Sequence, residues 1–182
     1  MLRPLSAYRR LAADAAPVHP LDALRRPALA ALVVGSAISI GATGRATAPL
    51  VVSTTICWSF VVLWQLVAAA VIARSSSTAL TMSQRLDLLF TGQAPWSLWL
   101  LIAAGWSRVV PQHTDLYALL STSAIPGVWT LLIVYGFCRT VLQLTARVAL
   151  RRAVLHQALI WTFAFFYVTW AVALWSRMRW FG

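Results

Sequence analysis

Apolar residues fill five long blocks of this 182-residue chain, and short polar or charged stretches separate them. A helix that crosses the hydrocarbon core of a bilayer needs roughly 17–25 apolar residues. Each block is close to that length, so the pattern predicts an all-α, polytopic membrane helical bundle of about five transmembrane helices plus short interfacial helices. The predicted spans lie near 27–43, 48–73, 95–110, 116–138 and 156–176.

The remaining residues divide into an amino-terminal arm and the connections of one bundle. Residues 1–26 form a predicted cytoplasmic arm that lies on the membrane surface, and residues 27–182 form a single transmembrane bundle. The 79–93 stretch alternates leucines with polar residues in a weakly amphipathic pattern, which predicts a short helix along the membrane surface. The basic segment 147–152 should be an interfacial continuation of the last span.

A flank of small residues marks the first span. Ala31, Gly35, Ser39 and Thr43 recur every four residues and therefore share one face of a helix. Small side chains let a second helix approach closely, either within the chain or across a homodimer seam, and we favour packing within the chain. Gln65 in the second span should face another helix, where an interhelical hydrogen bond is worth about 1 kcal/mol.

The composition supports a membrane protein. Hydrophobic residues make up 60% of the chain and charged residues 10%, whereas soluble domains carry about 25% charged residues. The two cysteines, Cys57 and Cys138, lie inside apolar blocks at different depths, which argues against a disulfide framework. We expect both to act as small buried hydrophobic residues.

Arginine provides all fifteen basic side chains, and the formal net charge is +11. The absence of lysine, glutamate and asparagine indicates the codon bias of a GC-rich bacterial genome. With five spans, eleven arginines fall on the side of the amino terminus and four on the other side. Positive residues stay cytoplasmic, so the chain should be a multi-pass protein of the inner (cytoplasmic) membrane with its amino terminus inside.

Basic side chains beside apolar spans are typical of contacts with anionic lipid rather than with nucleic acid. The arginines that flank the first and last spans are therefore the predicted head-group ligands. They are Arg25, Arg26, Arg147, Arg151 and Arg152.

The chain offers little reactive chemistry, and we predict no catalytic residue, no cofactor and no metal. The closest pair of potential metal ligands is His113 with Asp115, which is too few for a site. A Ser/His hydrolase needs both groups at one depth, but Ser36 and Ser39 lie deep in their span while His156 is near the end of its own. All four aspartates fall in the arm or the connections, which makes a proton relay unexpected.

Three places in the chain resemble the bacterial branch of the Yip1 family of small five-span membrane proteins. These are the Leu-Asp-Ala-Leu-Arg-Arg-Pro entry at 21–27, the polar connection 79–93 before Pro95, and the run from Trp129 through Tyr135-Gly-Phe and Arg139 to the arginines of 147–152. The acidic amino-terminal motif of the eukaryotic members is absent, so their role in vesicle traffic is not implied. The resemblance implies a non-enzymatic membrane protein that acts as a scaffold or assembly factor.

Two functions follow from these observations. The first is a non-catalytic integral membrane adaptor, scaffold or assembly subunit that binds anionic lipid and another membrane protein or itself. The alternative is a small transporter or channel component that acts as an oligomer or with a larger subunit. The Gly/Pro interruptions near Gly35, Gly41 and Pro126–Gly127, together with Gln65, favour the alternative. An enzyme that acts on lipid has the least support.

Overall fold

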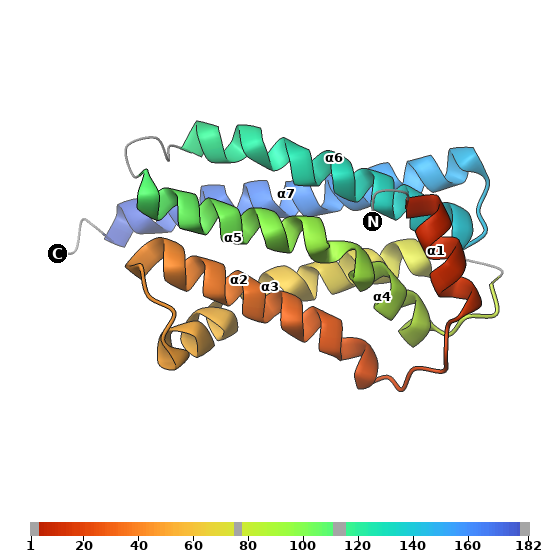
Figure 1. The fold of residues 1–182 in the computed structure, drawn as a ribbon. Coiled ribbons are helices and arrows are strands. Elements are labelled where there is room, and N and C mark those ends of the chain that lie inside the picture. The colour runs from red at the N-terminus through yellow and green to blue at the C-terminus, as the bar shows by residue number, and fades with distance from the viewer. Residues whose placement is uncertain (1–3, 75–77, 111–115, 179–182) are drawn as a thin grey trace.

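Helices account for the secondary structure of the chain throughout residues 4–74, 78–110 and 116–178, which the computed structural model describes (Figure 1). No strand occurs within these ranges, which confirms the predicted all-α class. In chain order the elements are α1 (Pro4–Ala13), η1 (Asp22–Leu24), α2 (Arg25–Thr43), α3 (Ala48–Ala73), α4 (Met82–Phe90), η2 (Thr91–Gln93), α5 (Ala94–Val109), α6 (Leu116–Thr140) and α7 (Ala146–Met178).

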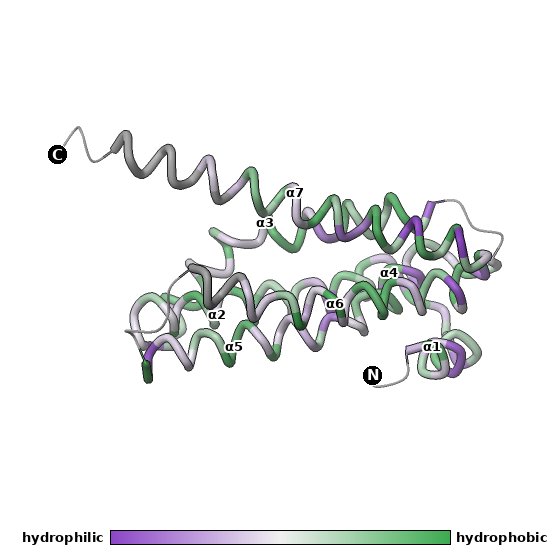
Figure 2. The backbone as a smooth tube through the Cα atoms, turned by 90° about the horizontal axis from the view of Figure 1, so that it is seen from above, coloured by the Kyte–Doolittle hydropathy of each residue, from purple (hydrophilic) through white to green (hydrophobic). Residues whose placement is uncertain are grey.

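The five long helices run side by side and contact one another in a closed circuit. Helix α2 contacts α3 and α5, α6 contacts α5 and α7, and α7 returns to α3. Seen from above, α3 and α7 form one layer, and α2, α5 and α6 form the other (Figure 2). Successive long helices alternate in direction, as antiparallel neighbours joined by short connections must.

Four stretches are long and apolar enough to cross a membrane, by length and composition: Asp22–Thr43, Ala48–Ala73, Met82–Val109 and Ser121–Thr140. The second coincides with the predicted span 48–73. The predicted span 156–176 lies within α7, but the side chains beyond Trp170 are outside the described part, so five spans stay a prediction. The protein is a multi-pass membrane helical bundle.

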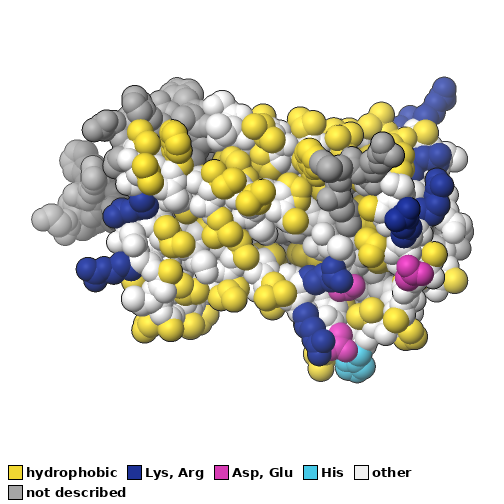
Figure 3. All heavy atoms as spheres, viewed as in Figure 1, with side chains coloured by type: hydrophobic (Ala, Val, Ile, Leu, Met, Phe, Trp, Pro, Cys, Tyr) yellow, Lys and Arg dark blue, Asp and Glu magenta, His cyan; other side chains and the backbone are white. Residues whose placement is uncertain are grey.

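Large apolar side chains cover the outside of these helices. On α3 alone, Val52, Ile56, Leu63, Val67 and Val71 are exposed at helical spacing. Hydrophobic side chains cover much of the visible surface between the two ends of the molecule, where arginines gather (Figure 3). Monomeric soluble proteins rarely expose such continuous apolar surface, whereas hydrocarbon solvates it without cost.

The turn between α2 and α3 depends on one glycine. Gly44 caps α2 with φ of +72°, and its N–H donates to the Ile40 carbonyl at 2.8 Å. A Cβ at this position would come within 2.5 Å of the Arg108 guanidinium, so glycine also makes room for that side chain. Pro49 then occupies the first turn of α3, where its missing N–H leaves no bond unmade.

The small-residue flank of α2 lies against α3 in the same chain. A Cβ at Gly35 would be 2.6 Å from the Thr55 Cα, and the Thr54 hydroxyl donates to the Gly35 carbonyl at 2.8 Å. Ser39 is fully buried and donates to the Arg45 carbonyl at 2.7 Å. Along the same flank, Ala31 is half-buried and Thr43 is exposed.

The best-packed part of the interior lies at one end of the bundle. Its fully buried members come from α1, α3, α6, the segment after α6 and the first turns of α7. They include Tyr8, Ile72, Ile133, Phe137 and Leu142. Further from this end, aromatic rings of α3 and α7 fill the interface: the ring centroids of Phe60 and Tyr167 lie 4.7 Å apart.

Helix α1 is part of this interior. The sequence predicted a position on the membrane surface for the arm but did not predict this packing. Tyr8 has 0% exposure, and its ring meets that of Phe137 edge-on with centroids 5.8 Å apart. A Cβ on Gly136 would lie 3.1 Å from that of Pro4, so this glycine lets α1 cross α6 closely. Arm and bundle therefore share one core.

The amphipathic segment forms α4, and its apolar face is covered by protein. Leu88, Leu89 and Phe90 are buried. Thr81 and Gln84 form a capping box at the start of α4, and the Gln84 amide donates to the Ala16 carbonyl at 3.0 Å. The helix packs against α3 and leads through η2 directly into α5, and its position along the membrane surface stays a prediction.

The cysteines divide differently from the prediction. Cys138 is buried in the core, as expected, but Cys57 is exposed on the surface of α3, so its predicted burial is wrong. A span presents only part of its surface to other helices, and hydropathy does not tell which part. Both thiols are free.

The contact at Gly35 should be sensitive to a single methyl group. We expect Gly35→Ala to lower the free energy of unfolding by about 1–3 kcal/mol, because the new Cβ overlaps the Thr55 backbone. Gly105→Ala is the matched control, since nothing lies within 4 Å of its Cβ position. Thermal denaturation in detergent measures both. Equal melting temperatures for the two variants would contradict the assigned α2–α3 contact.

Candidate functional site

The arginines gather mainly at one end of the bundle, which we call the basic end. It contains the amino-terminal residues of α2 and α7 and the carboxyl-terminal residues of α3 and α6 (Figure 1). Arg45 and Arg108 lie at the opposite end. The alternating directions of the helices bring together arginines that are far apart in the sequence. In the described ranges they are Arg9, Arg10, Arg25, Arg26, Arg74, Arg85, Arg139, Arg147, Arg151 and Arg152.

Two of these arginines complete the carboxyl end of α3. Arg85 donates to the carbonyl of Ala73 at 2.8 Å and also to those of Leu80 and Thr78, at 2.9 and 3.2 Å. Arg152 from α7 donates to the carbonyl of Ile72. The last carbonyls of a helix lack intrahelical donors and carry the negative end of its dipole, so guanidinium groups satisfy both needs. These contacts tie α3 to α7 and to the segment before α5.

Arg26 has a similar internal role. Its guanidinium pairs with Asp87 of α4 at 2.7 Å and also reaches the Thr91 hydroxyl. The Asp87 side chain is only 19% exposed, so solvent screens this pair less than a surface pair. Arg25 pairs with Asp22 at 2.9 Å, but this pair is open to solvent and contributes little to stability.

The structure therefore divides the five predicted head-group arginines. Arg26 and Arg152 are engaged by groups of the protein. Arg25, Arg147 and Arg151 are exposed, and within the described ranges neither Arg147 nor Arg151 has an acidic partner. Head-group binding stays a prediction for these three, while Arg26 and Arg152 belong to the internal contacts of the basic end.

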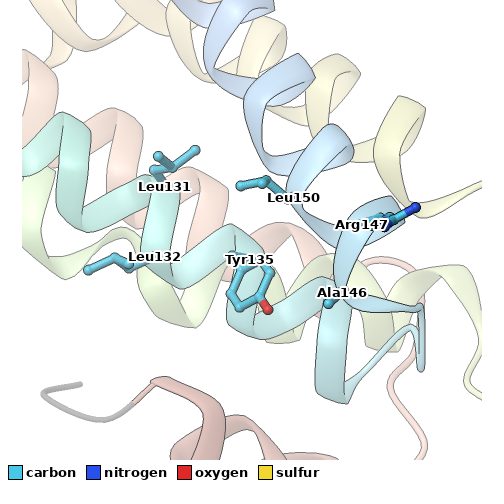
Figure 4. Close-up of a pocket in the computed structure, with 6 residues that line it drawn as sticks. All are labelled: Leu131, Leu132, Tyr135, Ala146, Arg147 and Leu150. Carbon is cyan, nitrogen blue, oxygen red and sulfur yellow. The ribbon is translucent and has the colours of Figure 1, made fainter.

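An apolar groove lies beside the unpaired Arg147. Its volume is 370 Å³, and its lining residues come from α6 and the first turns of α7. Leu150 extends from α7 toward Leu131 of α6, whereas the Arg147 guanidinium is directed away from the leucines (Figure 4). The groove thus combines a leucine-rich surface with a cation at its edge. The lining residues are Leu131, Leu132, Tyr135, Ala146, Arg147 and Leu150.

Gln65 lacks the expected interhelical hydrogen bond. It is half-buried, and no hydrogen bond of its side chain occurs within the described residues. The neighbouring Trp64 provides the link instead: its indole N–H donates to the Leu159 carbonyl of α7 at 3.1 Å. Tryptophan was counted as apolar when the spans were predicted, so the hydropathy pattern did not predict this hydrogen bond.

Several buried polar atoms have no hydrogen-bond partner within the described part of the chain. They are the Tyr8 hydroxyl, the Thr55 hydroxyl, His156 Nδ1 and Gln157 Nε2. His156 is buried inside the bundle. Burial raises the pKa of the Tyr8 phenol above its ordinary value. These atoms lie on α1, α3 and α7, and no contact among the described residues joins them into one reactive site.

The described ranges contain no group of three His, Cys, Asp or Glu side chains that could hold a metal ion. His113 and Asp115, the pair considered from the sequence, lie outside them. Comparisons with protein-family models, with curated proteins and with solved structures found no match. The basic end and its groove are therefore the candidate functional site.

The internal role of Arg85 can be separated from its charge. Arg85→Gln should lower the free energy of unfolding by about 2 kcal/mol, because carbonyls at the end of α3 lose a charged donor. Arg74→Gln removes the same charge from an exposed residue next to α3 and should change stability by less than about 0.5 kcal/mol. Thermal melts of both variants in detergent test this. A loss of similar size in Arg74→Gln would mean that net charge, and not the carbonyl contacts, is responsible.

Proposed function

We propose that this protein is a non-catalytic adaptor, scaffold or assembly subunit of a bacterial inner membrane. It binds anionic lipid at its basic end and, along its helices, another membrane protein or a second copy of itself. The observation that carries the proposal is that the arginines at the basic end have two different roles. Arg26, Arg85 and Arg152 hold helices together, while Arg147 and Arg151 are left for external anions.

The polar contacts between helices at the basic end support a scaffold. The Arg26–Asp87 pair joins α2 to α4, Arg85 joins α4 to the end of α3, and Arg152 joins α3 to α7. Tyr8 adds α1 to the same unit through Phe137. A scaffold must hold its binding surfaces at fixed positions, and this network of short contacts restricts how the helices can move relative to one another.

The outer surface of α7 supports a protein partner. Trp161, Phe165, Phe166 and Trp170 are all exposed there, and Phe165 is 65% exposed. Between helices in lipid, association depends on van der Waals packing rather than on the hydrophobic effect. Large rigid rings provide extensive packing at a low cost in side-chain entropy. The resemblance to the bacterial Yip1-like proteins points to the same class of function.

The alternative of a small transporter or channel component has one observation in its favour. His156 Nδ1 and Gln157 Nε2 are buried without a partner in the described ranges, and unpaired polar groups can line a polar path. Fully buried Phe137 and Leu142, however, fill the interior at the basic end. A continuous passage would require this packed core to separate, so the adaptor has the better support.

The orientation follows from the arginine asymmetry. With the basic end in the cytoplasm and five spans, the carboxyl terminus should lie outside. A reporter fused after residue 182 that is active only in the periplasm should give signal, and its cytoplasmic counterpart should not. The same reporter pair inserted in the α2–α3 turn at Ala46 controls for reporter function. A cytoplasmic carboxyl terminus would mean that α7 does not span the membrane.

Site-specific crosslinking in intact membranes tests the adaptor. A photoreactive phenylalanine analogue at Phe165 should yield a crosslinked species of defined mass, identified by mass spectrometry as another membrane protein or a dimer. The analogue at Val52, exposed on α3, serves as the matched position on another surface. Crosslinks at either position support a partner, and their ratio identifies the surface. A lone monomer at both positions contradicts the adaptor, and solute flux through such a monomer in proteoliposomes would favour the alternative.

A further inference from the structure

We propose that the α6–α7 groove binds one acyl chain of an anionic phospholipid whose phosphate is held by Arg147. This inference rests on the proposed function for its membrane placement and its anionic-lipid ligand. It adds a defined site to a general basic surface.

The groove has the chemistry that an acyl chain requires. Leu131, Leu132 and Leu150 are three of its six lining residues, and its 370 Å³ lies within the range of about 300–1,000 Å³ typical of ligand sites. It is open at the outer surface of the bundle, beside the exposed side chains of Leu132 and Leu150. In a membrane these residues are solvated by lipid, so a chain enters the groove without crossing water.

The position of Arg147 supplies the charge complementarity. The groove begins where α7 begins, at the basic end, so its cation lies where phospholipid phosphates lie. Two aspartates at the basic end, Asp22 and Asp87, already pair with Arg25 and Arg26. Among the described residues no acidic group pairs with Arg147, so its charge is available to an external anion.

The geometry favours a lipid over a transmembrane helix of a partner as the occupant. The arginine stem lines the apolar groove while the guanidinium points away from the leucines, which matches a ligand with an apolar chain and a charged head (Figure 4). Tyr135 adds an amphipathic ring with its hydroxyl on the side of Ala146, as tyrosines do at membrane interfaces. A partner helix would bury a stripe of several turns, whereas this groove spans only Leu131 to Tyr135 along α6.

Native mass spectrometry of the full chain in detergent provides the test. Palmitoyl-oleoyl phosphatidylglycerol and the phosphatidylcholine with the same chains are titrated in parallel, and glycerol 3-phosphate tests the head group alone. We expect selective binding of phosphatidylglycerol and none of glycerol 3-phosphate. Arg147→Gln should weaken phosphatidylglycerol binding about fivefold, the effect of one charge near the membrane surface. Arg151→Gln, exposed one turn later on α7, should have a much smaller effect.

A second pair of variants tests the groove itself. Leu150→Trp should fill it and reduce binding of the lipid. If this variant folds poorly, Leu132→Trp on the facing helix replaces it and should have the same effect. Equal losses in Arg147→Gln and Arg151→Gln with full binding in both tryptophan variants would overturn the site in favour of diffuse surface charge. Binding of glycerol 3-phosphate comparable to that of the lipid would also overturn it. None of these outcomes depends on a protein partner, so the lipid site and the adaptor function can be contradicted separately.

Discussion

The inability of hydrocarbon to form hydrogen bonds is the constraint on which this structure depends. Within a bilayer every backbone carbonyl and N–H must be satisfied by the protein, so the spans are helices. Helix ends add a need of their own, because terminal carbonyls have no partner within the helix. At the end of α3 the solution is arginine: Arg85 and Arg152 donate to the carbonyls of Ala73 and Ile72. The same contacts join α3 to its neighbours.

This use of arginine links stability to the proposed function. A protein with fifteen arginines and four aspartates cannot neutralise its charge internally. Carbonyl groups can take the place of aspartates as partners of a guanidinium group, and both Arg85 and Arg152 donate to carbonyls at the end of α3. Arg147 and Arg151 have neither kind of partner in the described ranges. An anionic membrane surface provides the missing negative charge, so the features that complete the fold also determine where lipid can bind.

The two halves of the bundle are packed by different means. At the basic end, aliphatic and aromatic side chains from α1, α3 and α6 are fully buried around Phe137 and Ile133. Further from this end, α3 and α7 meet through rings such as Phe60 and Tyr167, and α7 leaves Phe165 exposed. Dense packing and the arginine contacts fix the helices at the basic end, while an exposed aromatic surface can accommodate a second molecule. This asymmetry favours an adaptor over a passage through the centre.

The sequence by itself determined the number and limits of the apolar blocks, because span length and hydropathy are properties of each segment alone. It placed α3 at 48–73, anticipated that residues 147–152 continue the last helix, and placed small residues at Gly35 and Ser39 on one flank. Only the tertiary structure decided which groups meet. It buried Tyr8 and one face of α4, exposed Cys57, gave the α3–α7 link to Trp64 instead of Gln65, and separated Arg26 and Arg152 from Arg147. These outcomes depend on how each helix is rotated about its axis and how closely its neighbours approach, and a pattern of apolar residues around a whole helix does not define either.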